Sequence, residues 1–333
     1  FHSFFQRFYD EVFFPYLEQH NILHVVQLGD MFDRRKYINF QSLKLGRHYL
    51  FDRLNQGYTT WALVGNHDTY YKNTNEINSL ELLLDGYNNI NVVNTPTEVE
   101  FEDKKFLLLP WICQDNEKQC MDAIHTTDAD AIVGHFEIAG FEMYRGAVCD
   151  EGLSMDMFKK HPMVLSGHFH HKSSHQNIQY LGTPYEITWS DYNDQKGFHV
   201  YETDTGELTF IPNPFVMFHK VHYDDDNTTM EQVLSVDFKQ YKGTIVKVIV
   251  RNKTNPHWFD MFIDKLEKAG VVDMQVVEDH FHLDLEADDD IVNEAEDTLT
   301  ILNKYVDSMQ IQGDRQRLDN LIRTLYHEAL NVE

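Results

Sequence analysis

The sequence contains very little cysteine. Its 333 residues include only Cys113, Cys120 and Cys149. The number is odd and no two of them form a Cys-x-x-Cys pair, so the sequence excludes a disulfide framework and gives no sign of a thiolate zinc site. With 42% apolar residues, the chain can bury one large core and a smaller one. We expect a protein of a reducing compartment.

Long hydrophobic runs are absent as well. No apolar stretch approaches the roughly 20 residues that a membrane-spanning helix needs. No basic leader is followed by a short apolar core, as it would be in a signal peptide. These absences argue against an integral membrane protein and predict a cytoplasmic location.

Basic residues are scarce relative to acidic ones. Lys and Arg number 28 against 54 Asp and Glu, which gives a formal net charge of −26. This balance argues against a module that binds nucleic acid through a basic face alone, because phosphate contacts normally come from Lys and Arg. If DNA is the substrate, metal ions or a partner protein must help to hold it.

The sequence does contain an alternation of helices and strands. Apolar residues between Phe1 and Tyr16 recur every three or four positions, which predicts an amphipathic helix that Pro15 bends or ends. A β-branched run at 22–27 predicts a buried strand. Similar patterns predict helices at 39–55 and 117–125, and strands at 59–64, 130–133 and 163–166. This rhythm is typical of an α/β fold.

Alternating runs further along the chain predict hairpins and a second, more antiparallel sheet. They cover 97–110, 177–186 and 197–212. Residues 1–214 are therefore expected to form two stacked sheets flanked by helices. A strand, helix and strand within 215–285 predict a small α/β cap, and 286–333 predict a helical partner-binding segment.

Four predicted strands end in polar residues of the kind that bind metals. Any one of them alone is more often a turn residue or a satisfied core group. Because sites in open α/β sheets gather at the carboxyl ends of strands, their combination predicts one shared site. The motifs are GDMFDRR with Asp30, GNHD with Asn66 and His67, GH with His135, and GHFHH with His168 and His170.

These residues have the chemistry of a two-metal centre. The Asp30 carboxylate can bridge two cations, the Asn66 amide oxygen adds a hard ligand, and neutral imidazoles complete the shell. Mixed oxygen and nitrogen ligation suits Mn or Fe better than Mg. Two such cations, about 3.5–4 Å apart, hydrolyse phosphoesters.

Residues beside the ligands supply candidate catalytic groups. His67 is the natural general acid for the leaving oxygen, and either Asp33 or Asp68 could hold its ring in the right tautomer. Arg34 and Arg35 could clamp a phosphate oxygen. A solvated surface pair is an equally good reading of these two arginines.

The order GD-x-x-DR, GNHD, GH and GHxH resembles the calcineurin-type metallophosphoesterases. Among them, residues 1–210 look most like the SbcD-like nuclease subunits, especially the phage recombination endonuclease subunits. The resemblance implies two divalent cations, manganese in the first place and magnesium as the alternative. It also implies these ligands: Asp30 bridging both cations, Asn66, His135 and His168 completing one site, and His170 serving the other.

The resemblance implies one further motif, an Asp-x-His on a first strand, which does not occur ahead of Phe1. Because the chain opens on the helix that should follow that strand, we expect the motif to lie upstream. A chain that truly lacked it would hold one metal poorly. It would then act as a scaffold that tethers DNA or an ATPase.

The last predicted helix carries an apolar stripe. The stripe can pack on the preceding helix or dock on a partner coiled coil, and the resemblance implies an SMC-like ATPase as that partner. Homodimerisation through 40–54 and 80–84 is implied in the same way. The candidate partner-binding residues are Leu318, Leu321, Ile322, Leu325 and Leu330.

Taken together, the sequence predicts a Mn-dependent exonuclease and endonuclease subunit of an SMC-like ATPase–nuclease complex. Such a complex would process DNA ends in recombination, replication and double-strand break repair, in the host cytoplasm if a phage encodes it. Two alternatives stay open. One is a phosphatase or small-molecule phosphodiesterase, because GD-x-x-DR also resembles Ser/Thr phosphatases, and the other is the scaffold.

Overall fold

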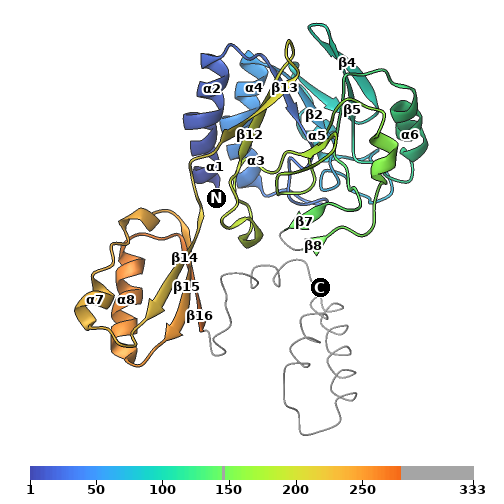
Figure 1. The fold of residues 1–333 in the computed structure, drawn as a ribbon. Coiled ribbons are helices and arrows are strands. Elements are labelled where there is room, and N and C mark those ends of the chain that lie inside the picture. Colours follow the sequence, from blue (N-terminus) through green and yellow to red (C-terminus); the bar gives the residue numbers. More distant parts are fainter. Residues whose placement is uncertain (145–146, 279–333) are drawn as a thin grey trace, which may run out of the picture. The chain divides into compact units, whose positions relative to one another are not determined.

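The computed structural model describes residues 1–144 and 147–278, which form two compact units (Figure 1). The first unit contains 1–144, 148–219 and 243–245. The second contains, among the described residues, 220–242 and 246–278. None of the helices within these described ranges is long and apolar enough to cross a membrane.

A parallel sheet of three strands forms one layer of the first unit. Its strands lie in the order β1 (His24–Gln27), β2 (Thr59–Leu63) and β3 (Ile90–Val93). Side chains alternate across β2, so that Ala62 faces the helices while Trp61 and Leu63 face the second sheet. The helices on the outer face are α1 (His2–Phe8), α2 (Phe14–Gln19), α3 (Phe40–Gly46), α4 (Asp52–Gly57) and α5 (Ser79–Leu83).

A mixed sheet of six strands forms the next layer. Its four inner strands run parallel, whereas the two outer strands pair antiparallel with their neighbours. Helix α6 (Glu117–Thr126) packs on its outer face through Cys120 and Ile124. The order is β10 (Ser173–His175), β11 (Ile178–Tyr180), β9 (Val164–Ser166), β6 (Ala131–Gly134), β5 (Lys104–Leu109) and β4 (Thr97–Phe101).

A shared apolar core joins the two sheets face to face. Leu63 and Val93 come from the first sheet, and Leu108 and Val133 from the second. Because helices cover both outer faces, the unit is a layered sandwich of helix, sheet, sheet and helix. The predicted fold class, an α/β two-sheet sandwich flanked by helices, is confirmed.

Two details of the sequence-based prediction are settled by the structure. Pro15 does not end the first helix, which continues to Gln19 after a π-helical turn at Tyr9–Phe13. Such turns interrupt the regular hydrogen-bond ladder, and Pro15 then fits because it lies in the first turn of α2. The second sheet is the more antiparallel of the two, as predicted, because β4 pairs antiparallel with β5 and β10 with β11, although its inner pairs are parallel.

Short elements complete the first unit. A two-stranded sheet pairs β12 with β13 antiparallel. The other elements are brief connections. They are β7 (Glu142–Tyr144), β8 (Ala147–Val148) and the 3₁₀ turns Met155–Phe158 and Trp189–Asp191. The two strands of the small sheet are β12 (Gly197–Glu202) and β13 (Glu207–Pro212).

The second unit has its own sheet and core. Its strand order is β14 (Phe218–Asp224), β15 (Ile245–Asn252) and β16 (Asp273–Glu278), with α7 (Met230–Leu234) and α8 (Pro256–Lys268) on one face. Asn255 caps α8 by accepting hydrogen bonds from the first N–H groups of the helix, and Pro256 occupies its first turn. The core is built on Val246, Val248 and Val250 of β15. The predicted strand, helix and strand are therefore present.

Candidate metal centre

The four motif loops leave the carboxyl ends of four strands. Asp30 follows β1 and Asn66 follows β2, whereas His135 follows β6 and His168 follows β9. The four strands therefore belong to two different sheets, and the site lies where the same edges of the two sheets meet. The four loops thus come together, as the sequence predicts, and they come from both sheets.

The four side chains point toward one another. The Asn66 Oδ1 atom lies 2.9 Å from Nε2 of His135 and 3.2 Å from Nδ1 of His168. The two ring nitrogens are 3.2 Å apart, and Nε2 of His135 is also 3.2 Å from Oδ2 of Asp30. One ligand atom from each of Asp30, His135 and His168 lies within 4.8 Å of the other two.

This geometry depends on close approaches that only glycine permits. Gly29 has φ +95, and a Cβ there would meet the His135 ring at 2.4 Å. A Cβ on Gly65 would lie 2.2 Å from the main-chain nitrogen of Asp30. The glycines of GD and GNHD therefore bring the first two loops against each other.

Asp30 itself has a left-handed backbone with φ +55, which L residues rarely adopt. The fully buried Asp68 stabilises this turn. Its carboxylate accepts hydrogen bonds from the main-chain N–H groups of Asp30 at 2.9 Å, Gly65 at 2.8 Å and Phe32 at 3.3 Å. Asp68 thus fixes the main chain of both loops, which is a different role from orienting the His67 ring.

The charges of the cluster favour an ionised Asp30 carboxylate and a neutral His168 ring. Burial acts against both charges, but the neighbouring His135 lowers the pKa of Asp30 to about 2. Asp30 in turn outweighs burial at His135 and raises its pKa. Burial and the nearby His135 lower the pKa of His168 to about 3, so this ring stays neutral and keeps a nitrogen lone pair for a ligand.

The donor set fits a divalent cation. Nδ1 of His135 lies 2.7 Å from the carbonyl oxygen of Leu28, so this nitrogen carries the proton and Nε2 is left to bind. A carboxylate, an amide oxygen and two imidazoles are ligands of Mn and related metals. Oδ2 of Asp30, Oδ1 of Asn66, Nε2 of His135 and Nδ1 of His168 carry lone pairs that face one another. A cation bound between them would relieve this repulsion.

His67 lies beside the cluster, and its exposed ring is not one of the grouped ligands. Its main-chain N–H donates to Oδ1 of Asp30 at 2.7 Å, and its exposed ring places Nδ1 2.6 Å from the main-chain carbonyl oxygen of Asp33. The contact therefore uses the carbonyl of Asp33, while its carboxylate lies 3.5 Å from Nε of Arg34. Nε2 is the second nitrogen of this exposed ring.

The remaining candidates lie outside this group. Arg34 donates a hydrogen bond to the Tyr37 hydroxyl within its own loop. His170 places Nδ1 3.6 Å from Oδ1 of Asp191. The predicted partner-binding residues fall outside the described part of the chain; they are Leu318, Leu321, Ile322, Leu325 and Leu330.

The sequence reasoning missed Trp111. Its half-buried ring lies 5.4 Å from the ring of His168 and 6.0 Å from that of His135, measured between centroids. Its main-chain N–H donates to the carbonyl of Val64 at 2.7 Å. Trp111 lies just past the end of β5, as the other site residues lie just past the ends of their strands. The sequence pattern therefore marked its position, but tryptophan is not a metal ligand and was not considered.

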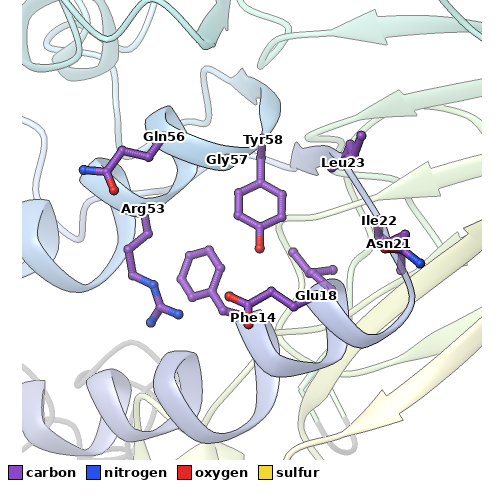
Figure 2. A pocket seen from close by; sticks show the side chains of 10 residues that line it. Phe14, Glu18, Asn21, Ile22, Leu23, Arg53, Gln56, Gly57 and Tyr58 are labelled. Atoms are coloured by element: carbon purple, nitrogen blue, oxygen red, sulfur yellow. The ribbon is translucent and has the colours of Figure 1, made fainter.

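A cavity of about 430 Å³ lies elsewhere in the first unit (Figure 2). Phe14 and Glu18 of α2, Arg53 of α4 and Tyr58 line it. Tyr58 and its neighbour Leu23 precede β2 and β1, whereas the metal-centre loops follow these strands. The cavity is therefore at the opposite edge of the sheet and separate from the candidate centre.

The chain is similar to several known proteins. The chain is 33% identical over 320 residues to exonuclease subunit 1 of Enterobacteria phage T4, covering 94% of this chain and 90% of that protein. It is 27% identical over 132 residues to the SbcD component of the nuclease SbcCD of Staphylococcus epidermidis, 35% of each protein. No protein-family model matches. A solved archaeal phosphodiesterase, 15% identical, gives a TM-score of 0.32 over 60% of this chain and 88% of that one.

The similarity to the T4 protein extends along nearly the whole of both chains, and the shorter SbcCD match falls on a protein that is likewise a nuclease subunit by name. The predicted resemblance is thereby confirmed. The chain belongs to the family of phage exonuclease subunit 1 and the SbcD-like nuclease subunits, and it is a metal-dependent phosphodiesterase of the nuclease class.

Proposed function

We propose that this chain is the Mn-dependent nuclease subunit of an ATPase–nuclease complex that trims DNA ends. The observation that carries the proposal is the convergence of Asp30, Asn66, His135 and His168 within mutual ligand distance. These residues would hold one cation, with Asp30 bridging to a second. His170 would serve that second site together with ligands contributed from outside the cluster.

Cations held there would polarise the phosphodiester and lower the pKa of an attacking water. His67 would act as the general acid. With the Nδ1 proton donated to the Asp33 carbonyl, a protonated ring directs its second proton from Nε2 toward the leaving oxygen. Arg34 is exposed in the next loop and would meet the phosphate backbone after exchanging its Tyr37 contact.

The acidic composition supports a role for a partner protein in binding the DNA. A net charge of −26 repels DNA, so cations and a DNA-binding ATPase would hold the substrate at the site. The relatives from phage T4 and Staphylococcus epidermidis are both subunits by name. We propose that the partner is an SMC-like ATPase and that the 286–333 segment binds it. Residues 1–214 would form the nuclease domain and 215–285 a cap, and the chain would form a homodimer.

Phe40 supports the homodimer. It stands at the start of α3 with 89% of its surface exposed, within the 40–54 stretch expected to pair. An aromatic ring this exposed at a helix start gains free energy when a second copy covers it. The place of action would be the host cytoplasm during recombination, replication and break repair.

The test is cleavage by the full-length protein of end-labelled duplex DNA with Mn, beside a phosphopeptide and a cyclic nucleotide. Asp30→Ala and His168→Ala should abolish shortening of the duplex, and His125→Ala, an exposed histidine at the end of α6, should leave it unchanged. Preferential hydrolysis of the phosphopeptide or the cyclic nucleotide would overturn the DNA assignment. Cleavage that survives His168→Ala would overturn the centre.

A further inference from the structure

The first unit contains a lysine that is almost fully buried. Lys196 is only 4% exposed, and lysines are rarely buried unless their charge is paired. Its Nζ donates a hydrogen bond to the carbonyl oxygen of His170 at 2.8 Å, and it forms ion pairs with Oδ1 of Asp191 at 2.7 Å and Oδ2 of Asp194 at 2.8 Å. The buried ammonium charge therefore has two carboxylate partners and one carbonyl acceptor.

Both aspartates continue this network. Asp191 is fully buried, and its Oδ2 accepts hydrogen bonds from the main-chain N–H groups of Ile187 and Thr188 at 2.8 and 3.0 Å. Asp194 places Oδ2 2.9 Å from Nδ1 of His171. The segment 187–196 is thereby held together by hydrogen bonds of its own, and we call it the cradle of the histidine loop.

The cradle holds the end of the loop that carries His168. The His170 carbonyl accepts from the main-chain N–H of Thr183 at 3.1 Å as well as from Lys196. The His170 ring lies near Asp191 and the His171 ring near Asp194. Main chain and side chains are thus fixed at two successive residues, only two positions beyond His168.

His168 needs such an anchor because its backbone is strained. Its φ is +76, and the N–H of Phe169 donates to the carbonyl of Gly167 at 3.1 Å. A hydrogen bond from residue i+2 to residue i around a positive φ is the rare and strained form of the γ-turn. Strained residues persist only where their surroundings over-determine the conformation.

We propose that Lys196 is a positioning residue of the metal centre, which clamps the loop 167–171 and so holds the strained His168 ring against Asn66 and His135. On the other side of the strained turn, Gly167 donates from its N–H to the carbonyl of Gly134. The turn is thereby fixed at both ends. The inference rests on the proposed function, because it takes His168 as a ligand.

The clamp and a purely structural ion cluster differ in one measurable respect. A structural cluster would lower the melting temperature of Lys196 variants and leave the metal affinity of the folded molecules unchanged. A clamp would weaken metal binding in molecules that are still folded. Removing residues that orient ligands typically weakens metal binding about ten- to a hundredfold.

The experiment is titration of Mn²⁺ into full-length protein at 10 °C by calorimetry, with circular dichroism to confirm folding and pulsed EPR to detect bound imidazole nitrogens. Lys196→Met should bind Mn²⁺ about tenfold or more weakly and lose one nitrogen coupling. Lys105→Met is the matched control, because Lys105 forms an exposed ion pair with Asp128 in the same unit. It should bind like the unaltered protein.

A milder variant covers the case in which Lys196→Met does not fold. Asp194→Asn keeps the size of the side chain and removes one charge from the clamp, and it should weaken binding about two- to fivefold by the same argument. His168→Ala separates the two levels of the proposal. If His168→Ala binds Mn²⁺ normally, His168 is not a ligand, and both the proposed metal centre and the role of Lys196 are overturned. If only His168→Ala weakens binding, while folded Lys196 and Asp194 variants match the control, the clamp alone is overturned.

Discussion

The carboxylate of Asp68 accepts the main-chain N–H of Asp30 at 2.9 Å, and this bond links the GNHD motif to the strained turn of the GD motif. The two residues are 38 positions apart in the sequence. The bond means that the last residue of GNHD acts on the first loop. Asp68 thereby fixes the main chain that carries the Asp30 carboxylate.

Asp68→Asn should therefore weaken both the fold and metal binding. An amide offers one acceptor oxygen where three N–H donors converge, and its own N–H₂ group opposes them. Since a buried N–H group left without an acceptor costs about 1–3 kcal/mol, we expect the free energy of unfolding to fall by about 2–4 kcal/mol. Urea unfolding in EDTA measures this. Asp122→Asn, on the exposed face of α6, is the control, and equal stability of the two variants would contradict the role of Asp68.

His67→Ser should separate catalysis from metal binding. The His67 ring is exposed and lies outside the ligand cluster, so Mn²⁺ affinity should stay within about twofold. Loss of a general acid lowers kcat by about 10²- to 10⁴-fold on DNA. Bis(p-nitrophenyl) phosphate has a leaving group that needs no proton, so its hydrolysis should fall far less. An equal loss on both substrates would show that His67 is not the acid.

Much of this architecture could be predicted because its signals are local. Short apolar runs end in Gly and a polar residue, and this pattern alone locates the loops of Asp30, Asn66, His135 and His168. The structure brings these four side chains together. Whether they are the ligands stays a prediction that the variants above test.

The rest could not be predicted because strand pairing is not local. A buried parallel strand looks the same in either sheet, so nothing in the sequence around β6 shows that it pairs with β5 and β9 and not with β2. Lys196 was missed for a related reason. It follows Ser-Asp-Tyr-Asn-Asp-Gln, a polar stretch that is typical of a solvated loop, and only its distant contact with His170 shows that it is buried.

Phe14→Ala should lower stability and leave catalysis alone. The Phe14 ring is fully buried at the cavity of Figure 2, and the Arg53 guanidinium lies 3.8 Å above it while pairing with Asp10 at 2.6 Å. Truncating a buried phenylalanine costs about 3–5 kcal/mol. Glu18→Ala removes an exposed side chain from the same cavity and should change stability by less than about 0.5 kcal/mol.

The same pair of variants tests the position of the site. Because the cavity lies at the edge of the sheet opposite the metal-centre loops, kcat of folded Phe14→Ala at 10 °C should match that of Glu18→Ala. A large drop in kcat for Phe14→Ala alone, at full folding, would show that the cavity contributes to the reaction.

Glu186 should make the stability of the first unit depend on pH. Its side chain is 3% exposed, and Oε2 accepts the main-chain N–H groups of Met217 and Phe218 at 2.5 and 3.0 Å. Burial, opposed by these bonds and assisted by Asp191, raises its pKa to about 7. The folded protein therefore binds more protons than the unfolded chain between the ordinary carboxyl pKa and about pH 7. The free energy of unfolding should fall as the pH rises through this range.

Glu186→Gln removes this titration while keeping an oxygen acceptor. The variant and the unaltered protein should have similar unfolding free energies near pH 4.5, where the carboxyl is neutral in the folded state, and the variant should be more stable by about 1–3 kcal/mol at pH 8. Urea unfolding at both pH values in EDTA measures the difference. Glu76→Gln, on an exposed loop, should show no such trend. A Glu186→Gln variant that is less stable at pH 8 than at pH 4.5, relative to the unaltered protein, would mean that the carboxyl is held ionised by its two N–H donors.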